Sequence, residues 1–206
     1  MMTIDQGVAL VKMARKAIDA RLSNKPIRPD TVELDSLNKN HGAFVSLFDL
    51  RANRGLRGCV GDPLPKESLG RLVPRIAVEA ATNDFRFRPV KLDELRTHIV
   101  VEVNVLGPLE SISGSEPLDY VHQVKVGRDG VMVEGIGMKG LLLPEVGVEE
   151  GFGSEKFLVH CCLKAGLSPD AWLTGEARIS RFQTQTFTEE KPNGRVVKRR
   201  MDPGKQ

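Results

Sequence analysis

The stretch from Leu56 to Gly61, LRGCVG, places an arginine and a cysteine two residues apart, each beside a glycine. Side chains two residues apart in an extended strand share a face, so the guanidinium of Arg57 and the thiol of Cys59 are expected to lie side by side. A neighbouring cation lowers the pKa of a thiol and raises its thiolate fraction. The pattern predicts a nucleophilic Cys59 assisted by Arg57. The other interpretation is a small buried cysteine in a tight hairpin.

Gly58 and Gly61 leave two positions of this stretch without side chains. A glycine inside a strand weakens packing, and it commonly marks a bulge or the close approach of another group. Both glycines are therefore candidates for lining a ligand site. In the alternative interpretation only the backbone requires them.

A second polar stretch, NDFRFRP, runs from Asn83 to Pro89 and carries Asp84 and Arg86 between aromatic residues. The planar guanidinium of Arg86 suits a carboxylate or phosphate group, so both residues are candidate ligand-binding residues. The structural alternative is a helix end followed by an ordered loop, in which Asp84 accepts hydrogen bonds from backbone amides.

Two other patterns do not support a cofactor or a metal. The segment 135–140, GIGMKG, matches the G-x-G-x-x-G string, but the LLLP that follows lacks the helix start which that dinucleotide motif requires. It predicts a glycine-rich bend between two strands, or a loop that lines a ligand. His160, Cys161 and Cys162 are consecutive on a predicted helix and cannot converge on one ion. We therefore expect neither a cofactor nor a metal.

The net charge of +3 comes from one end of the chain of 206 residues. The last nineteen residues hold six Lys or Arg and three Asp or Glu, whereas residues 1–187 carry 24 of each sign. We expect residues 191–206 to form a mobile basic tail, which serves as a solubilising end or attracts phosphates, so a nucleic-acid partner is the lesser interpretation. The three cysteines form no disulfide framework, and no apolar run approaches the ~20 residues of a membrane span. We expect a cytoplasmic protein without a membrane partner.

Hydrophobic spacing predicts an α+β fold with a largely antiparallel sheet and flanking helices. The expected helices cover residues 4–22, 69–81, 116–123 and 154–165, the third capped by Ser115. The expected strands are 43–48 and LRGCVG as one hairpin, 99–106, the two arms of 124–135 as a second hairpin, and 177–187. Pro74 either starts a second helix or kinks the one that contains it. Residues 1–190 are expected to form one domain.

Several ordered motifs resemble those of the AMMECR family. LRGCVG is similar to its L-R-G-C-I-G signature, and AVEAATNDFRFRPV resembles its A-x-x-A-A-x-x-D-x-R-F-x-P segment. LLLPEV resembles its L-L-P-Q-V motif, with Glu145 in place of glutamine, and KFLVHCCLKAGL resembles its helix ending in K-A-G-L. The resemblance covers roughly residues 5–190.

The resemblance implies an α+β fold of two unequal lobes with a cleft between them, which the signature lines or borders. It implies no particular reaction. Through the gene neighbours of prokaryotic relatives, it suggests a Memo-like protein and a radical-SAM enzyme as partners, and modification of RNA or another macromolecule as the shared process.

Two hypotheses follow. In the first, the protein is an enzyme or part of one: Cys59 is a thiolate nucleophile or acceptor, Arg57 lowers its pKa and holds an anion, and Asp84 and Arg86 complete the site. In the second, the protein is a non-catalytic adaptor, and the glycines and arginines shape a docking cleft for a protein or nucleic acid. No histidine can be assigned to Cys59, so the sequence does not indicate a cysteine hydrolase.

Overall fold

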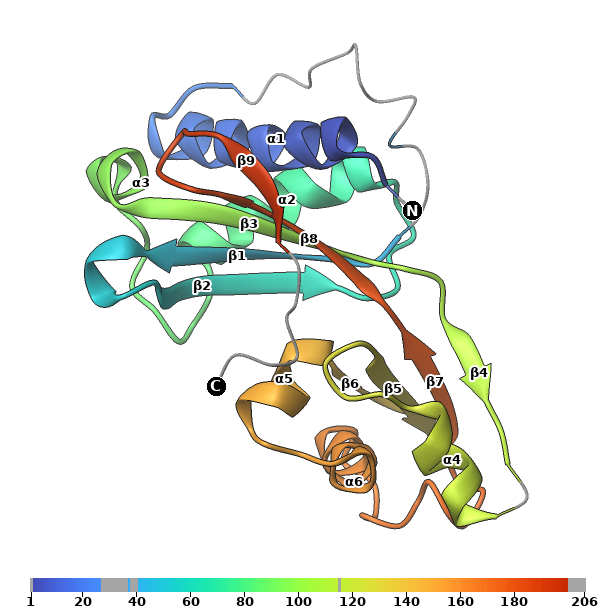
Figure 1. Ribbon diagram of the computed structural model, residues 1–206. Helices are drawn as coiled ribbons and strands as arrows, with labels where there is room; N and C mark the ends of the chain where they lie inside the picture. Colours follow the sequence, from blue (N-terminus) through green and yellow to red (C-terminus); the bar gives the residue numbers. More distant parts are fainter. Residues whose placement is uncertain (1, 27–36, 38–40, 115, 200–206) are drawn as a thin grey trace. The chain divides into compact units, whose positions relative to one another are not determined.

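The computed structural model describes residues 2–26, 37, 41–114 and 116–199 of the chain (Figure 1). The chain divides into two compact units. The first contains residues up to Leu106 together with 185–199, and the second spans Gly107–Thr184. The predicted α+β class with antiparallel sheets is confirmed. The cleft expected between two lobes stays a prediction, as does Ser115 as a helix cap, which lies outside the described residues.

Five strands of the described chain form the sheet of the first unit, in the order β2-β1-β3-β8-β9. They are β1 (Ala43–Asp49), β2 (Gly55–Asp62), β3 (Ile99–Leu106), β8 (Thr184–Glu189) and β9 (Val196–Arg199). Strand β1 is antiparallel to both β2 and β3, so the hairpin predicted to contain LRGCVG is confirmed. In this order β2 lies at one edge of the sheet.

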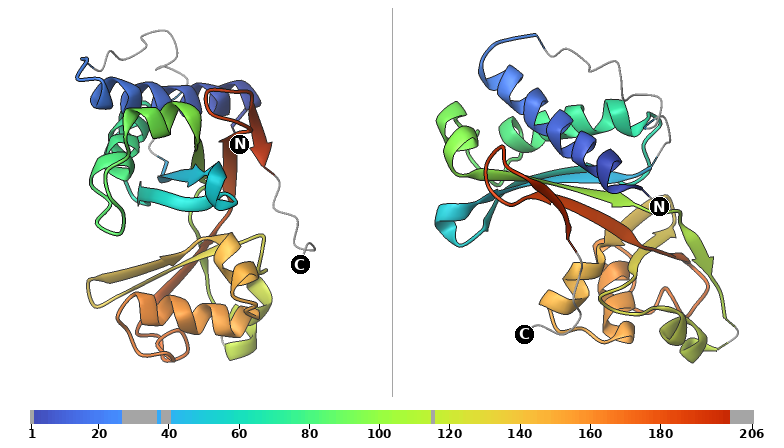
Figure 2. Two further views of the ribbon diagram at one scale, coloured as in Figure 1. Left: turned by 90° about the vertical axis from the view of Figure 1, so that its left-hand side faces the viewer. Right: turned by 45° about the horizontal axis from the view of Figure 1, so that its top comes forward.

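Helices α1 (Ile4–Leu22) and α2 (Leu69–Thr82) cover one face of this sheet, and α3 (Leu92–Thr97) lies beside β3 (Figure 2). Thr3 caps α1 through the amide of Gln6. Helix α2 continues through Pro74, so this proline does not start a second helix. The core between helices and sheet consists of buried aliphatic side chains, each stabilising the fold by about 2 kcal/mol. They include Leu10, Ile18, Val45, Leu47, Leu72, Ile76, Val101 and Val103.

One charged residue crosses this apolar layer. The guanidinium of Arg15 on α1 binds both carboxylate oxygens of Glu189 at the end of β8. It also donates to the backbone carbonyls of Leu95 and Ile99, at 2.9 and 2.6 Å. Glu189 accepts the amide of Val101 at 2.9 Å. Each nitrogen of the buried guanidinium thus donates at least one hydrogen bond, and the contact fastens α1 to the C-terminal hairpin.

The C-terminal segment differs from the prediction. Residues 196–199 form strand β9, antiparallel to β8, so they are part of the sheet and not of a mobile tail. The turn KPNG at 191–194, with Asn193 at a positive φ of 54°, reverses the chain and lets Val196 pack on the core. Residues 200–206 of the predicted tail lie outside the described residues.

The predicted strand 177–187 is in fact two strands that belong to different sheets. Strand β7 (Arg178–Phe182) lies in the sheet of the second unit and β8 in that of the first. The break falls at Gln183, whose carbonyl accepts the amide of Gly107 at 2.8 Å. Both residues belong to the second unit, so this hydrogen bond lies within it.

The second unit has a sheet of four described strands in the order β4-β7-β5-β6. Its elements are β4 (Glu110–Ile112), α4 (Pro117–Gln123), β5 (Gly130–Gly135), β6 (Met138–Leu142), α5 (Pro144–Glu149), α6 (Ser154–Lys164) and β7. The glycine-rich segment 135–140 is a bend between β5 and β6, as predicted, with Ile136 and Gly137 both at positive φ.

The hairpin predicted over residues 124–135 is wrong, because only its second arm is a strand. The carboxylate of Asp129 accepts the amide of Lys125 at 2.9 Å, and the carbonyl of Lys125 accepts the amides of Arg128 and Asp129. These local bonds stabilise a turn and take the place of a strand ladder. Within the described residues, no helix is long and apolar enough to cross a membrane.

We predict that Arg15→Leu lowers the free energy of unfolding by about 3–5 kcal/mol, because Glu189 would be left buried and unpaired. Urea denaturation measures the loss. Arg96→Leu is the matched control: Arg96 also pairs with an acid, Asp19, but its side chain is 55% exposed, so its removal should leave stability close to wild type. Equal stability of both variants would contradict the structural role of the buried pair.

Candidate functional site

Arg57 does not take the position that the sequence predicted for it. Its guanidinium donates to the backbone carbonyls of Arg88 and Pro89, at 2.6 and 3.3 Å, and to the carboxylate of Glu94 at 3.3 Å. The reason is a bulge in β2: Leu47 pairs with Gly58 but the next residue of β1 pairs with Leu56, so Arg57 is unpaired. A bulge breaks the period-two alternation, and Arg57 therefore anchors the loop after α2 instead of accompanying the sulfur of Cys59.

The two glycines of the signature are explained by close packing. A Cβ atom at Gly58 would lie 2.2 Å from the carbonyl oxygen of Ala80 in α2, and one at Gly61 would lie 2.1 Å from the ring of Phe44. No side chain fits at either position. Of the two interpretations, the structure supports the requirement of the backbone, and a ligand role for these glycines stays a prediction.

Asp84 and Arg86 form an ion pair against the outer edge of β2. The carboxylate of Asp84 accepts the amide of Cys59 at 2.8 Å, and Nη2 of Arg86 donates to the carbonyl of Cys59 at 3.0 Å. The Arg86 guanidinium binds both oxygens of Asp84, at 2.9 and 2.8 Å. The pair thus occupies the backbone groups that a neighbouring strand would otherwise bind.

Asp84 is ionised in this arrangement. Its side chain is 3% exposed, yet the hydrogen bonds from the Arg86 side chain hold its pKa well below the usual range, with a further contribution from the Cys59 amide. The pKa of Arg86 is raised by the same contact. The structural alternative predicted for Asp84, an acceptor of backbone amides, is therefore the one that the structure shows.

Cys59 points its side chain toward the neighbouring strand β1. Its backbone N–H and C=O both face Asp84 and Arg86, so its pair with Ser46 is one in which the two residues do not exchange backbone hydrogen bonds. Side chains approach most closely in such pairs. The hydroxyl of Ser46 accordingly lies 3.2 Å from the sulfur of Cys59.

The other two cysteines have a different environment. Cys161 and Cys162 are fully buried in the second unit, whereas Cys59 is partly exposed. Burial raises the pKa of Cys161 to about 12 and also raises that of Cys162. Cys161 and Cys162 are thus packing residues, and Cys59 is the one cysteine of the chain that is not fully buried.

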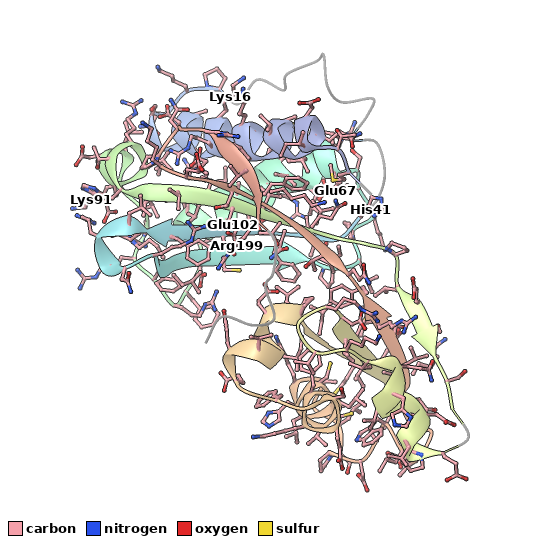
Figure 3. All side chains as sticks on the ribbon, viewed as in Figure 1. Lys16, His41, Glu67, Lys91, Glu102 and Arg199 are labelled. Carbon is pink, nitrogen blue, oxygen red and sulfur yellow. The ribbon has the colours of Figure 1, made fainter. Side chains whose placement is uncertain are left out.

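Beyond Ser46, the same sheet face continues into polar residues that the sequence analysis missed. Ser46 lies opposite Glu102 of β3 as well as opposite Cys59, so these three residues form one row across three strands. Glu102 is 5% exposed and forms ion pairs with Arg54 at 3.0 Å and Arg199 at 3.5 Å. Figure 3 labels Glu102 and Arg199. We call Cys59, Ser46, Glu102, Arg54 and Arg199 the polar row.

A sequence signal for the polar row existed. Glu102 is the charged residue in the otherwise apolar or amide-bearing strand IVVEVNVL, and Ser46 interrupts the apolar AFVSLF. A polar residue inside a buried strand requires a partner. The partners come from a turn and from the C-terminal strand, which no local pattern connects to β3.

A metal centre has no candidate in the described part of the chain, where no three His, Cys, Asp or Glu side chains gather around one point. The expected absence of a cofactor stays a prediction.

The fold and the site define a two-unit α+β protein with a partly exposed thiol on an antiparallel sheet, held at the edge by an ion pair. Residues 11–187 match the AMMECR1 family. Relatives include a protein of Methanocaldococcus jannaschii, 40% identical over 98% of both chains, and one of Pyrococcus furiosus, 42% identical over 97% of this chain and 96% of the other. The crystal structure of an uncharacterized protein from Pyrococcus horikoshii superimposes with a TM-score of 0.85 at 40% identity, covering 95% of this chain and 97% of that one. This chain belongs to the AMMECR1 family, which confirms the resemblance drawn from its motifs.

We predict that Asp84→Asn destabilises the protein at pH 7 by about 1.5–3 kcal/mol, the range for hydrogen bonds to a charged group. Because the folded-state pKa of Asp84 is depressed, its contribution is complete above pH ~4 and declines as the pH falls toward the folded value. The difference in unfolding free energy between wild type and variant should therefore be smaller at pH 3 than at pH 7.

Asp49→Asn serves as the control for this prediction. Asp49 also binds an arginine two residues later, Arg51, but holds no neighbouring strand. It should change stability much less than Asp84→Asn. A pH-independent loss for Asp84→Asn would show that its ionised form is not what stabilises β2.

Proposed function

We propose that this protein is a thiol-dependent group-transfer protein whose ligand binds on the polar row and reacts with Cys59. The observation that carries the proposal is that the backbone and the sulfur of Cys59 have different partners. Both backbone groups of Cys59 are bound by Asp84 and Arg86, the residue is partly exposed, and its sulfur accepts a hydrogen bond from the hydroxyl of Ser46. A nucleophilic residue whose backbone is fixed by hydrogen bonds and whose sulfur is not part of a disulfide is preorganised for attack.

The proposed reaction has two displacements. The thiolate sulfur attacks an electrophilic carbon of the ligand, a sulfur–carbon bond forms, and the leaving group departs with the bonding electron pair. The thiol proton passes to water. A nucleophilic group of a second substrate, such as an amine or hydroxyl of a protein or RNA, then bonds to the same carbon and loses its proton to water, and the sulfur departs with the bonding pair as the regenerated thiolate. The Ser46 hydroxyl stabilises the anionic sulfur in both steps by donating a hydrogen bond.

In this proposal the arginines of the two motifs have positioning roles. Arg57 and Arg86 are bound to backbone carbonyls and carboxylates of the protein itself. They fix β2 against the loop after α2, and through β2 they fix Cys59. The role in which Arg57 lowers the pKa of the thiol is not carried forward.

One observation favours a second function, a docking module for another protein. Phe85, between Asp84 and Arg86, is 96% exposed. Exposed aromatic side chains on ordered loops are typical anchors of protein interfaces. In this alternative Phe85 binds a partner, for which the Memo-like and radical-SAM proteins associated with the family are the first candidates, and the thiol is incidental.

We predict that iodoacetamide modifies Cys59 in the native protein while Cys161 and Cys162 stay unmodified until the chain unfolds. Peptide mass spectrometry at a series of pH values gives the rate at each cysteine, and the two buried thiols are internal controls. Ser46→Ala should slow the Cys59 reaction at pH 7 by about 3- to 10-fold, since one hydrogen bond to the sulfur contributes about 1 kcal/mol. A Cys59 that reacts only on unfolding is a packing residue, and the proposal would fail.

The docking alternative has its own test. Phe85→Ala should abolish binding to a Memo-like or radical-SAM protein from the same organism in a purified two-component pull-down, and Cys59→Ser should not. Leu118→Ala is the matched control, because Leu118 is also exposed, at 63%, but lies on α4 of the second unit. Reactivity of Cys59 without such binding favours the group-transfer proposal.

A further inference from the structure

We infer that the ligand of the polar row is a small anion, with a carboxylate or phosphate group held by Arg54 and Arg199 and its reactive carbon directed to Cys59. This inference rests on the proposed function and names the class of its substrate. It starts from the charges around Glu102. This single carboxylate forms ion pairs with two guanidinium groups, at 3.0 and 3.5 Å. One negative charge balances one of them, so the cluster carries one positive charge in excess.

The ion pair beside Cys59 does not change this balance. Asp84 and Arg86, which bind the backbone of Cys59, are paired with each other and contribute no net charge. The negative charge of Glu102 is already counted in the balance against the two arginines. The remaining positive field lies on the same sheet face as the sulfur.

The two arginines have donors to offer. Arg54 uses Nη2 for both Glu102 and the hydroxyl of Thr188, at 3.0 and 2.7 Å. Among the described residues, its Nε and Nη1 have no protein acceptor, and its side chain is 32% exposed. Arg199 is 54% exposed. Two guanidinium forks with outward donors are the groups that bind carboxylate or phosphate most effectively.

The conformation of Arg54 holds it over the sheet. Asn53 and Arg54 both have positive φ, 50° and 60°, which costs energy for residues other than glycine. The turn that results carries the guanidinium back to 5.1 Å from the ring centre of Phe48 on β1. A strained backbone persists where surrounding contacts stabilise it. Here the contacts of the Arg54 guanidinium do so, and they hold this cation at the polar row.

The geometry of the sheet limits the size of the ligand. Cys59 and Glu102 lie on either side of Ser46, one strand away each. Neighbouring strands are about 4.8 Å apart, so the arginine cluster lies roughly 10 Å from the thiol. A molecule with an anionic group a few bonds from its electrophilic carbon spans this distance.

The test compares two alkylating agents that differ in charge. Iodoacetate is an anion and iodoacetamide is neutral, and both attach to Cys59. We take the rate of iodoacetate at Cys59 over that of iodoacetamide and divide it by the same ratio for N-acetylcysteine amide. This normalised ratio measures the electrostatic field at the thiol. We expect a value of about 2–4 at low salt, the effect of one charge at this distance in a largely aqueous surrounding. It should approach 1 in ~1 M NaCl.

Three variants of the polar row should change this rate ratio, two of them downward and one upward. Arg54→Gln and Arg199→Gln should each lower the ratio to about 1 or below, and Glu102→Gln should raise it above the wild-type value. Arg199 is exposed at the end of β9, so its variant stays informative if Glu102→Gln does not fold. Arg96→Gln is the matched control: it changes net charge equally, and Arg96 pairs with Asp19 on the helical side of the unit.

Protection experiments separate the two ligand sources. Inorganic phosphate or acetate is added during iodoacetamide labelling of the full chain, with chloride at equal ionic strength as the reference. Slower labelling with phosphate alone identifies a phosphate ligand, and slower labelling with acetate alone identifies a carboxylate. The inference would be overturned if neither anion slows the labelling, the normalised rate ratio of the wild type is 1, and Arg199→Gln leaves that ratio unchanged. In that case a reactive Cys59 would still support the proposed function. A Cys59 that reacts with neither reagent would remove both.

Discussion

The ion pair of Asp84 and Arg86 binds both backbone groups of Cys59, and the geometry of the candidate site depends on this contact. An edge strand presents unpaired N–H and C=O groups that attract other chains or water. Here two side chains of one loop satisfy them. The register of β1 and β2 places Ser46 directly opposite Cys59 on the same face, so the thiol obtains its neighbour from β1.

Two of the motifs that carry the family resemblance, LRGCVG and the segment that contains NDFRFRP, are therefore one structural unit. LRGCVG supplies Arg57, which binds the loop that contains NDFRFRP, and that loop supplies the acid and the arginine that bind Cys59 in return. Gly58 lets α2 approach to the distance this exchange requires. Arg57, Asp84 and Arg86, which the sequence analysis took as candidate site residues, bind other groups of the protein and position β2. In our proposal the groups that bind a ligand are those of the polar row.

The C-terminal hairpin connects the hydrophobic core with that row. Glu189 at the end of β8 is the partner of the buried Arg15, so α1 and the hairpin are ordered together. The strand that follows carries Arg199 to Glu102. The positive charge of the chain end is thereby partly a charge of the candidate site, and the hairpin is a structural requirement for the proposed ligand.

The sequence by itself determined the family and those helices and strands whose hydrophobic spacing is regular. The period-four stripe of residues 4–22, the valine-rich 99–106 and the LRGCVG hairpin were readable because helices and strands impose their own spacing. The bend at 135–140 was predicted for the same kind of reason, since a dinucleotide loop would have needed a helix after it.

Only the tertiary structure decided which side chains meet. The bulge at Arg57 depends on the register of two strands, and the break at Gln183 depends on which sheet each half joins. The polar row joins Cys59 and Glu102 with Arg199, which lies 97 residues beyond Glu102 in the chain. Such long-range contacts cannot be predicted from hydrophobic periodicity. The spacing of residues indicates which face of a helix or strand a side chain occupies, but not which distant residue packs against it.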